Sequence, residues 1–373
     1  MIHLQNRKLE AGIYSNSYIL PCNLFGTPSL GGVTLGDGRY VKDSTWTEWD
    51  DLTAYGFNKG NVEYVDRTAI YIGVMMSIFG HTITDNLKKL WFLQSEEGKK
   101  LLEGETDVLC ITYMAQTLSP QVFEILQYAG VDIKKLKVIS KPTKYRTVYV
   151  PENSMISKEI KKNVGEKYYT IDFRETVLHI LDTIRKVSIE GAADRIYLSR
   201  TAFRSRRDYG EKRIERLFSK AGYRVVYPER LPFVEQVALM QYAKEIVTTE
   251  GSVSHMAMFS KPMTKWVILK KIDWENPYQL CINEMTKVDV VYLDANHSIT
   301  VECGWEGPFY LSPTKPVCNY LNVEMSDHYL WRLDYYGYLL YFCWCHFPLV
   351  KWGKGLAKIV IKMFNIGFFY KER

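Results

Sequence analysis

The sequence lacks the cysteine patterns that cross-link or metallate small domains. Its seven cysteines are odd in number and scattered, and no two have C-x-x-C spacing. A disulfide framework and a structural zinc site are therefore not supported, and we expect a reducing, cytoplasmic environment. A D-x-D tripeptide, which bridges a divalent cation to phosphate, is also missing. We therefore expect neither a bound metal nor another cofactor.

Long apolar runs are absent as well. The longest stretch near the C-terminal end without Asp, Glu, Lys or Arg covers residues 335–350, and Gly337, His346 and Pro348 interrupt it. A membrane-spanning helix needs about 20 apolar residues. The first seven residues also lack the apolar run of a secretory signal. We expect no transmembrane helix and no export.

Charge of one sign is in modest excess only. The formal net charge is +6 over 373 residues, so charge alone does not indicate nucleic-acid binding, and we expect no nucleic-acid partner. The chain is 47% hydrophobic and 24% charged, and it contains no low-complexity tract. These values are typical of a folded protein that is long enough for two domains.

Short strands alternate with helices in both halves of the chain. The strands expected in the first half cover residues 31–41, 63–74, 107–112, 137–140 and 145–150, with helices after Gly80 and at 120–129. A polar stretch at 151–167 and a helix at 171–187 lead to a second series of strands at 195–199, 223–227, 245–249, 265–270 and 288–293, with helices at 211–221, 232–243 and 252–260. Such alternation predicts βαβ units and parallel sheets.

We therefore predict an α/β fold of two Rossmann-like domains that face each other across a cleft. The first would cover residues 1–165, the second residues 166–326, and residues 327–373 would form an aromatic and basic tail.

A cluster of arginines follows the strand at 195–199. The loop carries Arg200, Arg204, Arg206 and Arg207. A guanidinium is a planar fork that binds phosphate oxygens in pairs, so this loop suits an anion. Arg200, at the end of the strand, is the first choice, and Arg206 and Arg207 cannot be separated by pattern. The alternative is a solvated basic loop.

The strand at 245–249 ends in a second polar segment, which runs Glu250-Gly251-Ser252-Val253-Ser254-His255. Gly251 permits close backbone approach, and Ser252 would cap a helix whose free N–H groups meet a phosphate. His255 would hydrogen-bond that phosphate or be a satisfied core histidine. In a parallel sheet both strand ends lie at one edge, so the two loops together predict a nucleotide diphosphate site.

Two further groups complete the set of candidates. Glu229 follows the strand at 223–227. It would line a site for the nucleobase or the ribose, or be only a turn residue. His81 and Asp85 lie four residues apart and therefore share a helix face. Either one could deprotonate an acceptor hydroxyl, with the other orienting it. The alternative is an ordinary polar pair at a helix start.

The C-terminal tail has the pattern of a basic amphipathic helix. Lys351, Lys354, Lys358 and Lys362 recur at helical spacing, and apolar residues fill the opposite face. Such a helix is typical of peripheral contact with an anionic membrane. The alternative is a helix that packs on the protein with its lysines in water.

Several of these motifs occur together in an order typical of a known family. They are Gly-Gly-Val-Thr-Leu at 31–35, Gly80-His81 with Asp85 and Leu87, Ile196–Arg200 with Arg206, Pro228-Glu229 with Phe233, Glu235 and Gln236, and Ile246-Val247 through Gly251-Ser252 to Phe259. In this order and spacing, over about residues 31–294, the chain resembles family 61 glycosyltransferases, in particular the DUF563-like branch of bacterial capsular-polysaccharide biosynthesis.

The resemblance implies a GT-B architecture of two Rossmann-like domains and metal-independent, inverting transfer from a nucleotide sugar, typically a UDP-sugar. By position, Arg200 with Arg206 or Arg207 would hold the diphosphate, and Gly251, Ser252 and His255 would line the donor site. His81 and Asp85 would face the acceptor.

We therefore expect a cytoplasmic transferase, peripheral at the inner face of the cell membrane, that adds a sugar to a cell-surface or lipid-linked glycan. Two alternatives stay open. One is a glycan-modifying transferase of the same architecture that moves pyruvyl or phosphoryl groups. The other is a non-catalytic protein that binds membranes or polyanions.

Overall fold

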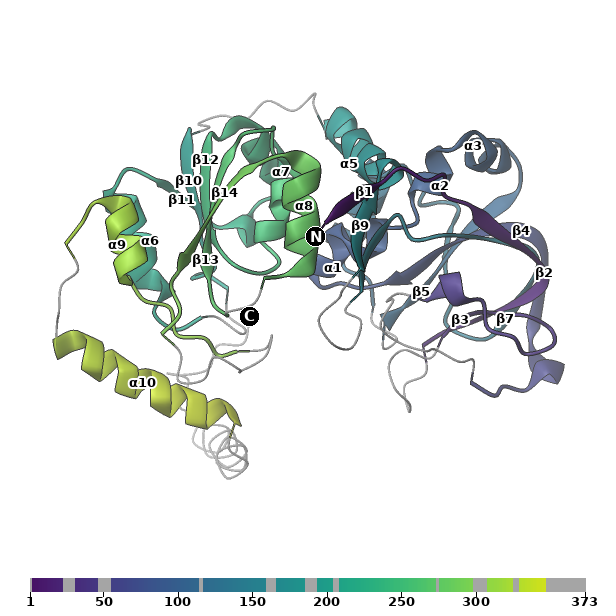
Figure 1. The fold of residues 1–373 in the computed structure, drawn as a ribbon. Helices are drawn as coiled ribbons and strands as arrows, with labels where there is room; N and C mark the ends of the chain where they lie inside the picture. The colour runs from purple at the N-terminus through teal and green to yellow at the C-terminus, as the bar shows by residue number, and fades with distance from the viewer. Residues whose placement is uncertain are drawn as a thin grey trace.

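The chain forms two lobes that lie side by side, each built on its own sheet (Figure 1). The computed structural model describes residues 2–22, 31–45, 55–113, 117–158, 166–184, 193–203, 208–272, 275–297, 307–324 and 329–346. Helices and strands alternate through most of this length, so the predicted α/β class is confirmed.

The first lobe contains a six-stranded mixed sheet in the order β3-β2-β7-β4-β5-β6. Its strands are β2 (Ala11–Leu20), β3 (Gly32–Thr34), β4 (Glu63–Met75), β5 (Thr106–Thr112), β6 (Leu136–Val138) and β7 (Thr143–Pro151). Strands β7, β4, β5 and β6 run parallel, whereas β2 is antiparallel to both of its neighbours. The β4 strand therefore points its carboxyl end toward the segment that carries His81.

The helix expected after Gly80 is broken into short pieces. They are α1 (Phe79–Ile83), the 3-10 turn η3 (Asp85–Leu87) and α2 (Trp91–Gln94), followed by α3 (Glu96–Glu103). The break has a polar cause. The Asn86 side chain bonds both the N–H and the C=O of Met76, at 3.1 and 3.0 Å, and the Thr84 hydroxyl donates to the Gly80 carbonyl at 2.8 Å. Such side chains compete with the helical backbone pattern.

A small three-stranded sheet lies between the lobes. It consists of β1 (His3–Gln5), β8 (Met155–Lys158) and β9 (Glu166–Thr170), in the order β1-β9-β8. The polar stretch at 151–167, expected to be a plain passage, therefore contributes strand residues at both of its ends. Strand β9 leads directly into α5 (Ile171–Ile184), which packs with helices of both lobes.

The second lobe contains a fully parallel sheet in the order β11-β10-β12-β13-β14. Its strands are β10 (Arg195–Leu198), β11 (Arg224–Val226), β12 (Glu245–Thr249), β13 (Lys265–Lys270) and β14 (Asp289–Asp294). The chain goes from β10 to one neighbour, β11, and returns to the other, β12. This is the strand order of a doubly wound sheet, and ligands bind such sheets at the carboxyl edge where the order reverses.

Helices cover both faces of this sheet. Between the sheet and the first lobe lie α7 (Phe233–Tyr242) and α8 (Pro277–Thr286), and on the outer face lie α6 (Glu211–Lys220) and α9 (Lys315–Leu321) (Figure 1). Helix α8 was missing from the sequence expectation, although Asn276 followed by Pro277 is a typical helix start.

Alternate side chains of a strand belong to different parts of the hydrophobic core. Ile196 and Leu198 on β10 join a buried cluster that also contains Ile70 and Val108 of the first sheet, whereas Tyr197 faces the outer helices. The two lobes therefore share one continuous apolar core, because successive side chains of a strand point to opposite faces. The polar segments at the strand ends lie around this core.

Helix α10 (Tyr329–His346) lies below the second lobe in Figure 1 and packs on it through the Tyr338 ring, which contacts Tyr209 and Tyr310. Tyr338 anchors it: the side chain is fully buried and its hydroxyl donates to the Pro308 carbonyl at 3.1 Å. None of the described helices is long and apolar enough to cross a membrane. The basic pattern of the tail, at 351–362, lies outside the described residues.

Candidate active site at the junction of the lobes

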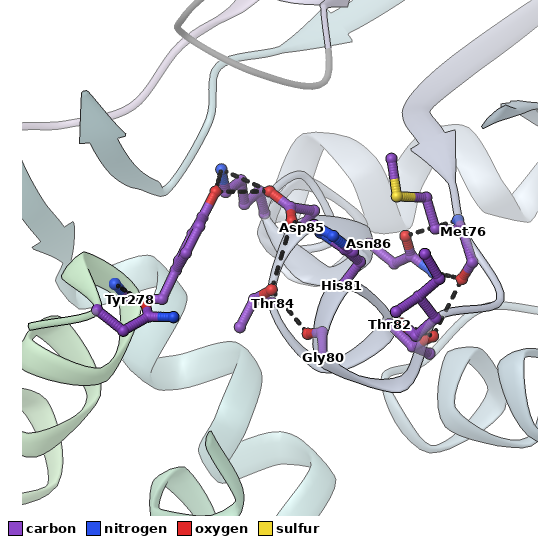
Figure 2. Close-up of polar contacts among 11 residues, drawn as sticks. Met76, Gly80, His81, Thr82, Thr84, Asp85, Asn86 and Tyr278 are labelled. Carbon is purple, nitrogen blue, oxygen red and sulfur yellow. Dashed lines mark hydrogen bonds and ion pairs between the residues drawn. The ribbon is translucent and has the colours of Figure 1, made fainter. Parts of the chain in front are cut away.

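His81 and Asp85 are in direct contact at the carboxyl end of β4. The Nδ1 atom of His81 lies 2.6 Å from Oδ2 of Asp85, and Figure 2 shows the pair beside Thr84 and Tyr278. The helical spacing therefore brings the two side chains together even though α1 ends between them. Asp85 is almost fully buried, whereas 36% of the His81 side chain remains exposed.

The environment of Asp85 keeps its carboxyl group ionised. Burial by itself would raise the pKa of Asp85, but the Lys88 ammonium 2.9 Å from Oδ1 and the hydrogen bond with His81 outweigh it, so the pKa lies below its ordinary value. An ionised carboxylate only accepts hydrogen bonds. His81 therefore donates through Nδ1, which fixes its orientation and tautomer.

A residue of the second lobe completes this cluster. The hydroxyl of Tyr278, on α8, donates to Oδ1 of Asp85 at 2.8 Å and accepts from Nζ of Lys88 at 2.9 Å. Lys88 is 1% exposed and its ammonium also lies 4.9 Å from the centre of the Tyr278 ring. Neither Lys88 nor Tyr278 was singled out in the sequence. Lys88 follows Asp85 by three residues, which is a usable ion-pair spacing, but no local pattern points to Tyr278.

On the donor side, Arg200 and Gly251 meet at the point where the strand order reverses. Arg200 follows β10 and Gly251 follows β12, and a Cβ atom built on Gly251 would lie 3.9 Å from Nη1 of Arg200. Gly251 has a φ of +128°, a backbone conformation that residues other than glycine rarely adopt. The expected convergence of these two strand ends is therefore present, with a cation beside exposed backbone.

The two halves of the site touch through Gly80 and Ser252. A Cβ atom built on Gly80 would lie 2.6 Å from the Ser252 hydroxyl oxygen and 3.1 Å from its Cβ. Hence only a glycine lets α1 approach the loop after β12 this closely. The segment that carries His81 and the loop that carries Gly251 consequently form one continuous surface.

The helix start expected at Ser252 takes a different form. Ser252 makes no cap; instead the Ser254 hydroxyl donates to the Gly251 carbonyl at 2.7 Å. The following segment, η6 (Ser254–Phe259), is a six-residue 3-10 helix. The expectation that Ser252 caps a helix is therefore wrong, because Ser254 satisfies the turn and Ser252 is used against Gly80.

His255 has the environment of a satisfied core histidine. It is 6% exposed, its Nδ1 lies 3.0 Å from Oε1 of Gln279, and burial lowers its pKa to about 4. It is therefore neutral at physiological pH. Its ring lies 6.5 Å from that of Tyr278, so it borders the cluster around Asp85 without carrying charge.

The remaining candidates lie at the same edge of the sheet or outside the described residues. Glu229 is exposed in the 3-10 turn η5 (Pro228–Arg230) after β11. Glu250 is buried, and burial raises its pKa although the Lys271 N–H, 3.4 Å from Oε2, opposes this. Arg204, Arg206 and Arg207 lie outside the described residues.

A second cluster of charged residues, which the sequence pattern does not indicate, lies beside Arg200 and consists of Glu211, Asp208 and Lys271. The backbone N–H of Arg200 donates to Oε1 of Glu211 at 2.9 Å, and Asp208 pairs with Lys271 at 2.5 Å. Burial, helped by the charge of Asp208, raises the pKa of Glu211 to about 7. Among the described residues, Oε2 of Glu211 has no hydrogen-bond partner.

A metal centre is not apparent in the described part of the chain, since no three His, Cys, Asp or Glu side chains there are grouped to hold an ion.

Replacing Gly80 should separate the lobes locally. We expect Gly80→Ala to lower the free energy of unfolding by about 1–3 kcal/mol, because its methyl group overpacks against Ser252. Urea denaturation measures this. Gly36→Ala is the control, since nothing lies within 4 Å of the added atom there. The double variant Gly80→Ala/Ser252→Gly should recover most of the loss; no recovery would contradict the contact.

The raised pKa of Glu211 makes stability depend on pH. The unfolded chain releases this proton near pH 4.5, whereas the folded protein keeps it until about pH 7. Wild type should therefore lose stability relative to Glu211→Gln as pH rises through this window, by about 3 kcal/mol in all. Urea denaturation at several pH values measures the difference. Parallel curves for the two proteins would contradict a buried, late-titrating carboxyl group.

The comparison with known proteins covers the part of the chain that carries both halves of this site. The family model described as Glycosyltransferase 61 matches residues 79–267, which is 189 of the 373 residues, or about half of the chain. The matched span begins at α1 and ends within β13. No match to a curated protein is found. The chain belongs to glycosyltransferase family 61.

Proposed function

We propose that this glycosyltransferase moves a sugar from a nucleotide donor, a UDP-sugar, to a hydroxyl of a cell-surface or capsular glycan with inversion at the anomeric carbon. The single observation that carries the proposal is the contact of Gly80 with Ser252. It sets a partly exposed histidine, bonded to an ionised carboxylate, next to the strand ends where Arg200 meets Gly251. The proposed base and the proposed diphosphate site thus adjoin.

His81 is the proposed base. An ionised, buried Asp85 is a weak base, since its pKa lies below the ordinary value, and its side chain is only 2% exposed. His81 is partly exposed, so an acceptor hydroxyl can reach its imidazole, and histidine is the side chain most often used as a general base. Asp85 would hold the imidazole and stabilise the imidazolium, as the carboxylate does in related dyads.

The reaction is a single displacement. The acceptor hydroxyl gives its proton to the His81 imidazole as its oxygen forms a bond to the anomeric carbon. The bond from that carbon to the diphosphate breaks, and UDP leaves with the electron pair. Arg200 and the backbone around Gly251 would stabilise the charge of the leaving diphosphate, aided by Arg206 or Arg207 of the same loop. In this scheme guanidinium groups stabilise the leaving diphosphate, a role that a metal ion has in metal-dependent transferases.

The second lobe supports a GT-B interpretation. Its parallel sheet, with the order β11-β10-β12-β13-β14, is Rossmann-like, and the donor would bind at its carboxyl edge. The first lobe contributes four parallel strands and places the His81 segment at the carboxyl end of β4. We propose that the acceptor binds on this lobe and that the protein belongs to the capsular-polysaccharide branch.

Two variants should separate donor binding from chemistry. Arg200→Ala should weaken UDP binding or turnover at least tenfold, about 1.4 kcal/mol, because the diphosphate loses a paired cation. His81→Gln should leave UDP affinity unchanged and lower turnover by at least about 100-fold. Titration calorimetry with UDP and a UDP-release assay measure these effects.

Arg224→Ala is the matched control, since Arg224 is an exposed arginine at the opposite, amino end of the same sheet. Failure of the wild type to bind UDP would favour pyruvyl or phosphoryl transfer. Salt-sensitive polyanion binding without turnover would favour the non-catalytic alternative. Asp85→Asn is a poor test, because it leaves Lys88 buried without its counter-charge.

We also propose that the C-terminal region contacts an anionic membrane from the cytoplasmic side and keeps the enzyme near a lipid-linked acceptor. On α10, Tyr336 and Leu340 are 62% and 73% exposed, while Tyr338 faces the protein. The lysines at 351–362 continue the chain directly after this helix. Apolar side chains next to a basic stretch are typical of an interfacial anchor.

Vesicle flotation tests the anchor. The full chain should bind vesicles that contain about one third anionic lipid, since each lysine near such a surface contributes about 1 kcal/mol. A chain ending at His346 should lose most of this binding but keep its fold, because the Tyr338 contact is retained. Equal binding of neutral vesicles would contradict the electrostatic part.

A further inference from the structure

The side chain of Tyr278 joins Asp85, the partner of the proposed base, to the donor-binding lobe. Asp85 and Lys88 belong to the first lobe, and Tyr278 belongs to α8 of the second. In Figure 2 the Tyr278 ring extends from α8 toward Asp85, where its hydroxyl meets both the carboxylate and the ammonium. The family match ends at residue 267, so α8 lies beyond it.

We propose that Tyr278 is a positioning residue for the transfer reaction, which sets the orientation and charge of the Asp85 carboxylate and through it the basicity of His81. The inference rests on the proposed role of His81, but the contacts that carry it do not depend on the identity of the donor. Tyr278 itself touches neither the reacting atoms nor the leaving group in this scheme.

The geometry makes the hydroxyl effective. Tyr278 and Lys88 both bond Oδ1 of Asp85, at 2.8 and 2.9 Å, while His81 bonds Oδ2 at 2.6 Å. Each donor on a carboxylate withdraws negative charge from it, and a hydrogen bond to a charged group is stronger than one between neutral groups. A less negative carboxylate holds the imidazolium proton less tightly. Loss of the Tyr278 hydroxyl should therefore strengthen the interaction between Asp85 and protonated His81.

The first turn of α8 holds Tyr278 in place through the donor-side loop. The Asn276 side chain accepts the backbone N–H groups of Tyr278 and Gln279, at 2.9 and 3.4 Å. Gln279 in turn bonds His255 of η6, the segment that follows Gly251. The position of the tyrosine hydroxyl is thus set by the same elements that shape the donor loop. The hydrogen bond from Tyr278 to Asp85 forms only when α8 is docked on the first lobe.

A direct test is the titration of His81 itself, followed by NMR of histidine-labelled protein without donor or acceptor. The chain has seven histidines, and His81→Gln identifies the resonance. Among the described residues, the charged and titratable groups around His81 include Asp85 and Lys88 from its own segment, Tyr278 from α8 and His255 from η6. His255 stays neutral through the range of interest, because burial lowers its pKa to about 4.

Tyr278→Phe should raise the titration midpoint of His81 by about half a pH unit or more, because Asp85 loses one donor while the Lys88 pair and the aromatic ring stay. Tyr223→Phe is the matched control. The Tyr223 hydroxyl likewise donates to a partly buried carboxylate, that of Glu245. This contact lies within the second lobe at the amino end of β12, away from His81. This control should leave the His81 midpoint unchanged.

A second substitution gives an effect of opposite sign. Site-specific 3-fluorotyrosine at position 278 is a stronger donor, so it should lower the His81 midpoint with the fold preserved. An unchanged or lowered midpoint in folded Tyr278→Phe, or a raised one with fluorotyrosine, would overturn the proposal. Absence of UDP binding would overturn the proposed donor instead, since neither titration uses a nucleotide.

Discussion

The site depends on keeping a negative charge ionised where water has little access. Asp85 is almost fully buried, and an isolated carboxylate in such a place would take up a proton. Three donors stabilise the charge of this carboxylate. Lys88 and Tyr278 bond Oδ1, and His81 bonds Oδ2. The same contacts fix the histidine tautomer, balance a buried lysine and join the two lobes. Loss of any partner would affect all three.

The broken helix after β4 makes this cluster possible. A continuous helix would carry Asp85 along a regular face, but the Asn86 bonds to Met76 fold the chain back against the strand end. Gly80 then lies against Ser252, and the exposed edge of the dyad borders the loop of Gly251. Local hydrogen bonds from polar side chains thus interrupt the helix, and the interruption places candidate site residues of both lobes next to one another.

Much of the fold followed from sequence periodicity. The strands at 245–249 and 265–270 have the bounds that were expected, because buried parallel strands read as short apolar runs between turns. Periodicity does not predict helix α8 or strand β2, and it predicts an unbroken helix after Gly80. These errors arise where capping or tertiary hydrogen bonds override propensity. Ser252 was expected to cap a helix, but no side chain caps η6, and the Ser254 hydroxyl bonds the Gly251 carbonyl.

The sequence by itself determined the α/β class, the family, the His81–Asp85 pairing and the placement of Arg200 and Gly251 at neighbouring strand ends. These features are local, since they follow from spacing along one segment or from strand polarity. Only the tertiary structure decided that Tyr278, 193 residues beyond Asp85 in the chain, donates to its carboxylate, and that Gly80 meets Ser252. Such contacts depend on how two lobes dock, and docking is set by the shape of the shared core rather than by any short pattern.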